Sequence, residues 1–502
     1  MSKEKSQSHE IQRPPVVAVM GHVDHGKSTL LDYIRKTNIV SGEVGGITQK
    51  ISAYEVIHAD EHGIDKQITF LDTPGHAAFS QMRARGAKVA DIAILVVSAE
   101  DSVKTQTIEA WNTIVEAGIP YIVAINKIDK ENANIEKTKI DLAEKGIYLE
   151  GYGGDIPFVL ISAKQGTGVD ELLSTILLVA ELGEFKGNPG LPASGIVIES
   201  NRDPKRGVSA TLIIKNGTLR KGMYIVASDT ITGTRMIEDY TGASINDATF
   251  SSPIRITGFD TLPPVGSDFT SYENKKDAEK AIESYKAKLE TKKTIPVAQS
   301  EIKTIPIVIK TDVNGMIEAI EKELTGLNTE EIAFKIVGRS VGAIGESDLK
   351  MASSDKNSIV LGFNVKVEPK ALELNEQLGV AIELFDIIYK LTDRMKEEME
   401  IRRPRTMTAD VLGTAKVLKI FSTTKERQLV GGRVTAGKLS EKSNIRIIRR
   451  DFEIGRGRIV GLQQGKISAK EVFEGNECGI MVEAKIEIAP GDMIESFIMI
   501  EK

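Results

Sequence analysis

The stretch Gly21-His22-Val23-Asp24-His25-Gly26-Lys27-Ser28 decides the fold of the first third of this chain. It follows the apolar run 16–20, which we expect to be a buried strand, and it leads into a helical pattern over 29–35. A glycine-rich loop in this setting turns its backbone N–H groups inward and adds the positive end of a helix, so that it can hold phosphate. Lys27 would then reach the β- and γ-phosphates of a nucleotide, and Ser28 would offer its hydroxyl to Mg²⁺.

A second motif, Asp72-Thr73-Pro74-Gly75-His76, follows the predicted strand 68–71. Asp72 is suited to hold Mg²⁺ through water, and Gly75 can offer its N–H to a γ-phosphate. Departure of that phosphate breaks the contact, so the segment can work as a switch. His76 could orient an attacking water. A single histidine is more often structural, but here its neighbours favour the functional interpretation.

Two short motifs later in the chain indicate which base is bound. Asn126-Lys127-Ile128-Asp129 follows the predicted strand 121–125, and Ser162-Ala163-Lys164 follows the strand 158–161 and closes the base pocket. The carboxylate of Asp129 can accept from both N1–H and the exocyclic amine of guanine, a donor pair that adenine lacks. Each motif is weak alone, but the four in this order predict a guanine-nucleotide-binding P-loop domain.

The 502 residues are too many for one hydrophobic core, and their apolar patterns predict several domains. We expect an α/β multidomain protein with a mostly parallel P-loop domain, two small β-barrels, one central three-layer α/β domain and a long connecting helix. The expected division is a polar tail 1–14, a GTP-binding domain 15–185, a barrel 186–273, a charged linker helix 274–302, an α/β domain 303–385, the long helix 386–404 and a C-terminal barrel 405–502.

The two strand-rich segments share turn sequences. Gly217-Thr218-Leu219 in the first resembles Gly437-Lys438-Leu439 in the second, and Val265-Gly266-Ser267-Asp268 corresponds to Ala489-Pro490-Gly491-Asp492. Duplication of one barrel would explain this, although any hairpin barrel reuses such turns. The charged helix between the barrel and the α/β domain has one apolar stripe, and a solvated linker is the simplest interpretation.

Composition excludes several classes of protein. Hydrophobic residues make up 41% and charged residues 27%, which is typical of a soluble globular protein and not of a disordered or collagen-like chain. Cys478 is the one cysteine, so an intrachain disulfide is impossible. No run approaches the ~18 apolar residues of a membrane-spanning helix, and the polar start has no secretory apolar region. We therefore expect a cytoplasmic protein with no membrane partner.

Charge is unevenly distributed along the chain. The net charge is −6, but residues 402–502 carry 19 basic and 13 acidic side chains, whereas the rest carries 46 basic and 58 acidic ones. A basic C-terminal module on an acidic body is either the footprint of an anion or nucleic-acid site or a chance imbalance of surface charge.

The first 185 residues resemble the G domain of the translational GTPases, and narrower motifs resemble bacterial-type translation initiation factor two. These motifs are Ser41-Gly42-Glu43-Val44-Gly45-Gly46-Ile47-Thr48-Gln49, Thr73-Pro74-Gly75-His76-Ala77-Ala78-Phe79 and Met82-Arg83-Ala84-Arg85-Gly86-Ala87. The resemblance continues through Val360-Leu361-Gly362-Phe363-Asn364-Val365 to Glu477-Cys478-Gly479, and so covers nearly the whole chain. The eukaryotic and archaeal counterpart usually departs from this pattern after His76.

The resemblance implies GTP and GDP as ligands, with Mg²⁺ held by Ser28, Thr48 and Asp72 when GTP is bound. His76 would be catalytic, and Val23 and Ile47 would form an apolar gate that keeps it away until the factor docks on the large ribosomal subunit. Together with the motifs above, the expected GTP-binding residues are Gly21, His22, Val23, Asp24, His25, Gly26, Lys27, Ser28, Thr29, Asp72, Thr73, Pro74, Gly75, His76, Asn126, Lys127, Ile128, Asp129, Ser162, Ala163 and Lys164.

The resemblance also implies the function of a translation initiation GTPase. Such a factor stabilises formylmethionyl initiator tRNA on the small ribosomal subunit, promotes subunit joining and hydrolyses GTP when the ribosome stimulates it. Its partners would be both ribosomal subunits, the initiator tRNA and other initiation factors, and we expect a monomer. The tRNA end would meet Glu477, Cys478 and Gly479, with Arg449 and Arg450 on its backbone. Alternatively, Cys478 is a small buried hydrophobe and the arginines are simply solvated.

Two other functions remain as alternatives. An elongation-type or specialised carrier of aminoacyl-tRNA usually has two barrels in succession after the G domain, whereas here an α/β domain and a long helix intervene. A metabolic enzyme with a similar G domain would lack the C-terminal helix and barrel. Gln463-Gln464-Gly465 stands where the family often has basic residues followed by an aromatic, so dependence on the formyl group is a question for experiment. Only about 14 residues precede the G domain, where many members carry a long region that helps to hold the small subunit.

Overall fold

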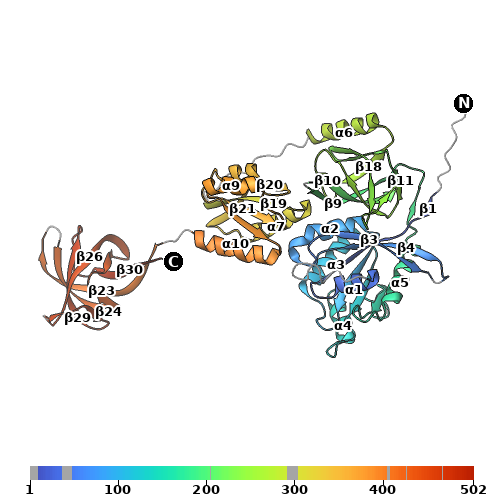
Figure 1. Cartoon of the computed structure of the whole chain (residues 1–502). Coiled ribbons are helices and arrows are strands. Elements are labelled where there is room, and N and C mark those ends of the chain that lie inside the picture. The colour runs from blue at the N-terminus through green and yellow to red at the C-terminus, as the bar shows by residue number, and fades with distance from the viewer. Residues whose placement is uncertain are drawn as a thin grey trace. The chain divides into compact units, whose positions relative to one another are not determined.

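The computed structural model of the protein describes residues 10–36, 48–60, 62–203, 205–290, 303–403, 407–424, 427–465 and 467–501. Every site residue expected from the sequence falls in these ranges except Ile47, which lies outside the described residues. The chain divides into two compact units, Met1–Ile401 and Arg402–Lys502. Figure 1 shows the elements of each unit, coloured along the chain.

A six-stranded sheet forms the centre of the nucleotide-binding part, in the order β3-β4-β2-β5-β6-β7. Its strands are β2 (Val16–Gly21), β3 (Ser52–Ala59), β4 (Asp65–Asp72), β5 (Ile92–Ser98), β6 (Tyr121–Asn126) and β7 (Phe158–Leu160). All neighbours are parallel except the β3–β4 pair. The parallel strands are buried on both faces, which is why they appear in the sequence as uninterrupted apolar runs. The prediction of a mostly parallel sheet is confirmed.

Helices cover both faces of this sheet. They are α1 (Lys27–Arg35) and α5 (Val169–Leu182) on one face, and α2 (Ser80–Val89), α3 (Thr105–Ala117) and α4 (Ile135–Glu144) on the other. A short 3₁₀ turn, η3 (Ala77–Phe79), precedes α2. Because the parallel strands end at the same edge, the loops after β2, β4, β6 and β7 come together there.

The first and eighth strands lie at the two ends of the nucleotide-binding part and pair with each other. β1 (Ile11–Gln12) pairs antiparallel with β8 (Lys186–Gly187). Beside this pair, Arg13 donates two hydrogen bonds of 2.5 and 2.6 Å to the buried carboxylate of Asp91, and Lys215 donates a third of 2.6 Å. These bonds join the nucleotide-binding part to the strands that follow it.

The first strand-rich segment forms an open barrel in which the path β13-β12-β18-β9-β10-β17-β14-β15 does not close. Its strands are β9 (Ser194–Asp203), β10 (Gly207–Asn216), β11 (Thr218–Arg220), β12 (Tyr224–Ala227), β13 (Thr230–Gly233), β14 (Ile237–Asp239), β15 (Ser244–Ile245), β16 (Asp247–Thr249), β17 (Pro253–Thr257) and β18 (Asp268–Tyr272). The charged helix α6 (Lys275–Glu290) follows. It is not wholly solvated, since Ala278 of its apolar stripe is fully buried.

The central α/β domain has three layers. Its four parallel strands are β19 (Lys303–Thr311), β20 (Ile332–Val341), β21 (Ile359–Phe363) and β22 (Ala381–Phe385), in the order β20-β19-β21-β22. Helices α7 (Asn314–Leu327) and the long α10 (Ile388–Arg402) cover one face, and α8 (Glu346–Ala352) and α9 (Pro369–Leu378) cover the other.

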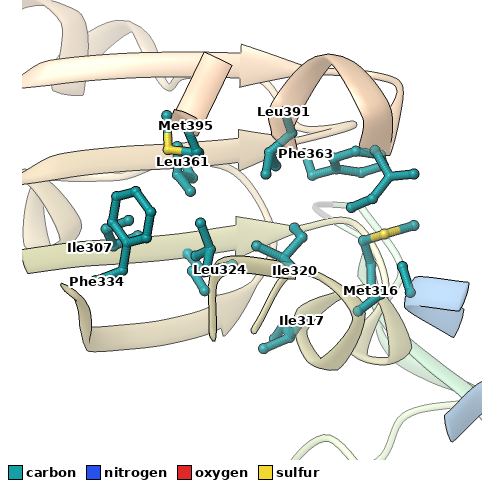
Figure 2. Packing of buried hydrophobic residues seen from close by; sticks show 14 of the residues in the cluster. Ile307, Met316, Ile317, Ile320, Leu324, Phe334, Leu361, Phe363, Leu391 and Met395 are labelled. Atoms are coloured by element: carbon teal, nitrogen blue, oxygen red, sulfur yellow. The ribbon is translucent and has the colours of Figure 1, made fainter. Parts of the chain in front are cut away.

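The core between α7, α10 and the sheet extends into the nucleotide-binding part. Figure 2 shows its labelled side chains, which include Met316 and Leu324 from α7 and Leu391 from α10. Ala78, Phe79 and Met82, which follow the switch motif, belong to the same buried cluster. The α/β domain therefore shares a hydrophobic core with the segment that carries His76.

The second unit is a closed barrel. Its strands are β23 (Met407–Thr423), β24 (Arg427–Ser440), β25 (Asn444–Arg449), β26 (Phe452–Gln464), β27 (Ile467–Ser468), β28 (Glu471–Phe473), β29 (Glu477–Ala484) and β30 (Met493–Glu501). β23 pairs with both β30 and β24, which closes the path β23-β30-β25-β26-β29-β24. The expected fold class is confirmed, with one barrel open and the other closed.

The pairings of the two barrels agree with the duplication hypothesis. β10 lies between β9 and β17 as β24 lies between β23 and β29, and β12 pairs with β18 as β25 pairs with β30. Across the described parts of both units, no helix is long and apolar enough to cross a membrane.

Candidate functional site

The phosphate loop lies between β2 and α1, as the sequence predicts. Gly26 has φ +86°, and a Cβ atom there would lie 2.4 Å from the side-chain amide nitrogen of Asn126. Gly21 has φ +144°, and a Cβ atom there would lie 2.4 Å from the carbonyl oxygen of Val96. Both positions therefore require glycine for backbone conformation and for space.

Lys27 is buried in this loop, and its ammonium group donates a hydrogen bond of 2.6 Å to the carbonyl oxygen of His22. Burial lowers the pKa of Lys27 to about 8, although the nearby carboxylate of Asp72 opposes this. A buried ammonium group with so few anionic partners gains stability when an anion arrives. The loop is therefore charged and shaped for phosphate.

The three predicted Mg²⁺ ligands converge beside Lys27. The hydroxyl of Thr48 lies 2.9 Å from that of Ser28, and it donates a hydrogen bond of 3.4 Å to the carboxylate of Asp72. These groups come from the start of α1, from the segment before β3 and from the end of β4. Their oxygen atoms are the hard donors that Mg²⁺ prefers.

A cavity of about 260 Å³ opens at this point. Its walls are Val23, Asp24, Gly26, Lys27, Ser28, Thr29, Thr48, Gly75, His76, Phe79 and Tyr389. All of these except Phe79 and Tyr389 were expected from the sequence. Tyr389 lies on α10 of the α/β domain, so a neighbouring domain supplies part of the wall.

The base-recognition motifs meet the phosphate loop through one side chain. Asn126 donates a hydrogen bond of 2.9 Å to the carbonyl oxygen of His25 and accepts one of 2.9 Å from the backbone of Ala163. Ser162 donates to the carboxylate of Asp129 over 2.7 Å, and this bond lowers the pKa of Asp129. The carboxylate is thus held ionised and ready to accept from a base.

The outer residues of these motifs have their own partners. Lys127 has φ +64° and forms ion pairs with Glu100 and Asp101, at 3.4 and 3.6 Å. The backbone of Ile128 donates to Ile161 over 3.4 Å. Lys164 is exposed. Hydrogen bonds therefore join the motifs at the ends of β6 and β7, although none of their residues lines the phosphate cavity.

Two expected nucleotide-binding side chains point away from the cavity. His25 is fully buried, and its ring lies 3.3 Å from the backbone nitrogen of Ser98 and 3.4 Å from the carbonyl oxygen of Val96. Burial lowers the pKa of His25 to about 3, so the ring is neutral. Thr73 donates its hydroxyl to the carbonyl oxygen of Val19 over 2.7 Å. These two side chains therefore hold the loops in place and line no part of the cavity.

His76 lines the cavity and is the N-cap of η3. Its Nδ1 atom accepts a hydrogen bond of 3.1 Å from the backbone of Ala78, so the neutral ring carries its proton on Nε2. Its ring contacts those of Phe79 and Tyr389, with centroids 6.1 and 4.5 Å apart. Burial lowers the pKa of His76, and the charge of Glu323 opposes this. Val23, the described half of the expected apolar gate, lines the same cavity.

The segment that carries Thr48 is anchored on the α/β domain, which the sequence motifs do not predict. The side-chain amide of Gln49 donates a hydrogen bond of 2.9 Å to the carbonyl oxygen of Asp386. It also accepts a hydrogen bond of 3.2 Å from the backbone N–H of Ile388, the first residue of α10. It thereby satisfies an N–H group at the start of that helix. Lys50 forms an ion pair with Asp312. Both switch segments therefore contact the α/β domain.

The C-terminal barrel holds a second cavity, of about 560 Å³. Its walls are Leu418, Lys419, Phe421, Leu429, Gly431, Gly432, Gln463, Gly465, Glu477, Cys478 and Gly479. The three residues expected to meet the tRNA end are thus together on one wall. Burial raises the pKa of Cys478 to about 11, which keeps its thiol protonated.

Arg449 and Arg450 do not line this cavity. Arg449 donates two hydrogen bonds of 2.8 Å to the carboxylate of Asp492. Arg450 lies in the turn between β25 and β26 with φ +50°. The structure therefore separates these two candidates, because Arg449 already has an anionic partner within the barrel.

The fold and the site together define a GTP-binding translation factor, and comparison with known families agrees. The Elongation factor Tu GTP binding domain model matches residues 12–181, the Elongation factor G domain 2 model matches 192–272, and the Translation-initiation factor 2 model matches 276–396. The chain belongs to the translation initiation factor IF-2 family. IF-2 of Bacillus pumilus is 44% identical over 501 residues, which is 97% of this chain and 70% of the relative.

A second IF-2 sequence is similar to the same extent. IF-2 of Bacillus subtilis is 43% identical over 501 residues, which covers 97% of this chain and 69% of the relative. Among solved structures, the crystal structure of GDP-bound aIF5B from Aeropyrum pernix has a TM-score of 0.48 and 26% identity, over 97% of this chain and 92% of that chain.

Proposed function

We propose that this chain stabilises formylmethionyl initiator tRNA on the small ribosomal subunit and promotes subunit joining, with GTP hydrolysis that the ribosome stimulates. The observation that carries the proposal is the relationship to IF-2 over 97% of the chain, which includes both the nucleotide site and the C-terminal cavity. The Translation-initiation factor 2 match over 276–396 favours initiation over the elongation-type alternative. Both subunits and other initiation factors would be its partners, and the cytoplasm its location.

The proposed division of labour follows the domain limits expected from the sequence. Residues 15–185 would bind GTP, 303–385 with the helix 386–404 would respond to the switches, and 405–502 would hold the tRNA end. Mg²⁺ fits the first of these, because the oxygen donors of Ser28, Thr48 and Asp72 converge there. A magnesium ion held by them would neutralise phosphate charge beside Lys27.

For hydrolysis, the chain would act by positioning and by charge stabilisation. The phosphate loop and Lys27 would hold the β- and γ-phosphates, and Gly75 would offer its N–H to the γ-phosphate. His76 would orient the attacking water through its ring. In the free protein this ring is occupied by the Ala78 hydrogen bond and by Tyr389, so intrinsic turnover would be slow until the ribosome repositions His76.

For tRNA, the second cavity would take the aminoacyl end. Leu418, Phe421 and Leu429 give it apolar walls that suit a methionyl side chain, and Glu477 stands at its polar side. Arg450 would meet the RNA backbone nearby. Gln463 lies on this wall together with the charged side chains of Lys419 and Glu477, so these three would supply its polar contacts.

Two measurements test the proposal with the full chain. Light scattering follows the joining of ribosomal subunits, which we expect to be faster with GTP than with GDP. Filter binding then compares formylated with unformylated initiator tRNA, and we expect the formylated form to bind more tightly. The initiation function would be rejected if the factor did not change the rate of subunit joining. It would also be rejected if elongator methionyl-tRNA bound as tightly as formylated initiator tRNA.

A further inference from the structure

Arg83 is the largest side chain that is fully buried in the described residues, although arginine is normally exposed. It lies in α2, behind the switch segment that carries Gly75 and His76, and its side chain is 1% exposed. A buried cation destabilises a fold unless its environment satisfies it with hydrogen bonds and an opposite charge. The partners of Arg83 therefore indicate its purpose.

One edge of the guanidinium group holds the switch backbone. Its Nη1 atom donates to three consecutive carbonyl oxygens, those of Pro74, Gly75 and His76, over 3.3, 3.2 and 2.5 Å. Carbonyl oxygens of adjacent residues do not converge on one point in a strand, where they alternate in direction. The cation therefore stabilises a local bend that the chain would not otherwise favour.

This bend fixes the direction of the opposite backbone groups. In a trans peptide the N–H points away from the C=O of the same unit. With the Pro74 and Gly75 carbonyls turned towards Arg83, the N–H groups of Gly75 and His76 point away from it. Gly75 itself backs on the phosphate loop, since a Cβ atom there would lie 2.5 Å from the ammonium nitrogen of Lys27 and 3.1 Å from the backbone nitrogen of Val23.

The other edge of the guanidinium group is held by Glu109 of α3, whose carboxylate accepts from Nη2 over 3.1 Å. The planar, rigid fork of arginine transmits this constraint from one edge to the other. The side chain of Glu109 is 42% exposed, whereas that of Arg83 is buried. The pair therefore holds the switch from the side of α3, and neither residue lines the phosphate cavity.

A second arginine on the same helix provides the contrast. Arg85 lies two residues further along α2 and pairs with Glu318 of α7. It makes no hydrogen bond to the switch backbone among the described residues. The two arginines occur in one sequence motif, but only Arg83 holds the carbonyls of the switch.

We propose that Arg83 is a positioning residue of the nucleotide site, which bends the switch segment so that the N–H groups of Gly75 and His76 face the γ-phosphate. It distinguishes GTP from GDP through Gly75 and touches neither nucleotide. The proposal rests on the proposed function, because it requires that this site binds GTP.

The test measures affinity for GDP and for a non-hydrolysable GTP analogue with the full chain, by fluorescent nucleotide titration. We expect Arg83→Met to weaken binding of the GTP analogue about tenfold, in the range of one lost hydrogen bond to a charged group, and to leave GDP binding nearly unchanged. Arg83→Lys, which keeps the charge but not the fork, should fall between Arg83→Met and wild type. Arg85→Met is the matched control and should bind both nucleotides as wild type does.

The outcomes separate this proposal from the function. Equal loss of GDP and GTP-analogue affinity, or no loss of either in a variant that melts like wild type, would overturn the role of Arg83. If Arg83→Met does not fold, Glu109→Gln decides, because its position is half exposed. A selective loss of GTP-analogue affinity in Glu109→Gln supports the proposal, and an unselective or absent effect rejects it. Failure of the wild-type chain to bind GTP would instead reject the proposed function.

Discussion

The ring of Tyr389 lies edge-to-face against the imidazole of His76, with centroids 4.5 Å apart and an angle of 79° between the planes. The two residues are separated by more than half of the chain, since His76 caps η3 and Tyr389 lies in the first turn of α10. Tyr389 also lines the phosphate cavity. The α/β domain therefore reaches the nucleotide site and covers the side chain that we expect to act on water.

Replacement of this tyrosine should change the titration of His76. Burial lowers the pKa of His76 because it disfavours the imidazolium form. Tyr389→Ala removes one wall of that burial, so we expect the pKa of His76 to rise towards its ordinary value of about 6.5. An NMR titration checks this, with the His76 signal assigned by its loss in His76→Ala. Tyr389→Phe keeps the ring and should titrate like wild type, and an unchanged pKa in Tyr389→Ala would contradict the covering role.

Removal of the imidazole should separate binding from turnover. We expect His76→Ala to abolish ribosome-stimulated GTP hydrolysis and to leave GTP affinity nearly intact, because the proposed role of the ring is to orient water, whereas the loop at Lys27 would hold the phosphates. Phosphate release with and without ribosomes measures this. His62→Ala, an exposed histidine of the β3–β4 turn, is the matched control. Equal turnover by His76→Ala and wild type would exclude a catalytic role for His76.

The base pocket predicts a change of nucleotide preference. Asp129→Asn replaces a hydrogen-bond acceptor with an amide that both donates and accepts. The variant should therefore bind guanine nucleotides more weakly and xanthine nucleotides more tightly than wild type does. Competition between GTP and xanthosine triphosphate measures this preference. Asp155→Asn alters an exposed carboxylate outside the pocket and should leave it unchanged. Retained selectivity for GTP in Asp129→Asn would refute the assignment of this residue to base recognition.

The ion cluster at Asp91 should contribute to stability in a way that depends on pH. Burial by itself raises the pKa of Asp91, but the hydrogen bonds and charges of Arg13 and Lys215 outweigh it and hold the pKa below its ordinary value. The cluster therefore stabilises the fold above the unfolded pKa of about 3.9, and this contribution is lost as the pH falls through the lower folded pKa.

Asp91→Asn should accordingly cost about 3–5 kcal/mol near neutral pH, the usual cost of breaking a buried ion pair, and much less in acid. Urea unfolding followed by the fluorescence of Trp111, the one tryptophan, measures it. Asp277→Asn removes a carboxylate whose pair with Lys280 is exposed, and it should have little effect. If the loss of unfolding free energy in Asp91→Asn were as large in acid as at neutral pH, the charge of Asp91 would not be its cause.

Arg449, the last residue of β25, and Arg450, in the turn that follows, should behave differently towards RNA. Within the described chain Arg450 forms no ion pair, whereas Arg449 is held by Asp492. We expect Arg450→Ala to weaken binding of initiator tRNA and to lower the slope of log affinity against log salt by about one. Arg449→Ala should leave the slope unchanged and destabilise the barrel. Salt titrations of the full chain decide, and identical slopes in Arg450→Ala and wild type would remove Arg450 from the RNA contact.

Much of the nucleotide site could be predicted because its parts are local in sequence. The phosphate loop occupies eight consecutive residues, and the other motifs follow apolar runs that form β4, β6 and β7. The predicted strand 16–20 is extended in the structure only by Gly21, and the predicted strand 121–125 only by Asn126. Residues that follow parallel strands can be placed from the sequence, because the carboxyl ends of these strands meet at the same edge of the sheet.

Long-range contacts could not be predicted in this way. Gln49 meets Asp386 across 337 residues of chain, and Tyr389 reaches His76 only because α10 packs against the α/β sheet. A charged residue such as Arg83 looks solvated in the sequence, and only its burial reveals its partners. The same holds for Arg449, whose charge indicated RNA but whose carboxylate partner is set by the register of β25 and β30.

The pairing of β1 with β8 brings Gln12 and Lys186 side by side, so the polypeptide enters and leaves the nucleotide-binding part at one place. Units with adjacent ends tolerate insertion into other chains. Recombination could therefore move this part between factors as a cassette without stretching either connection. A transplanted copy would keep its phosphate loop but would lose the wall that Tyr389 provides, so its new host would have to supply the cover of His76.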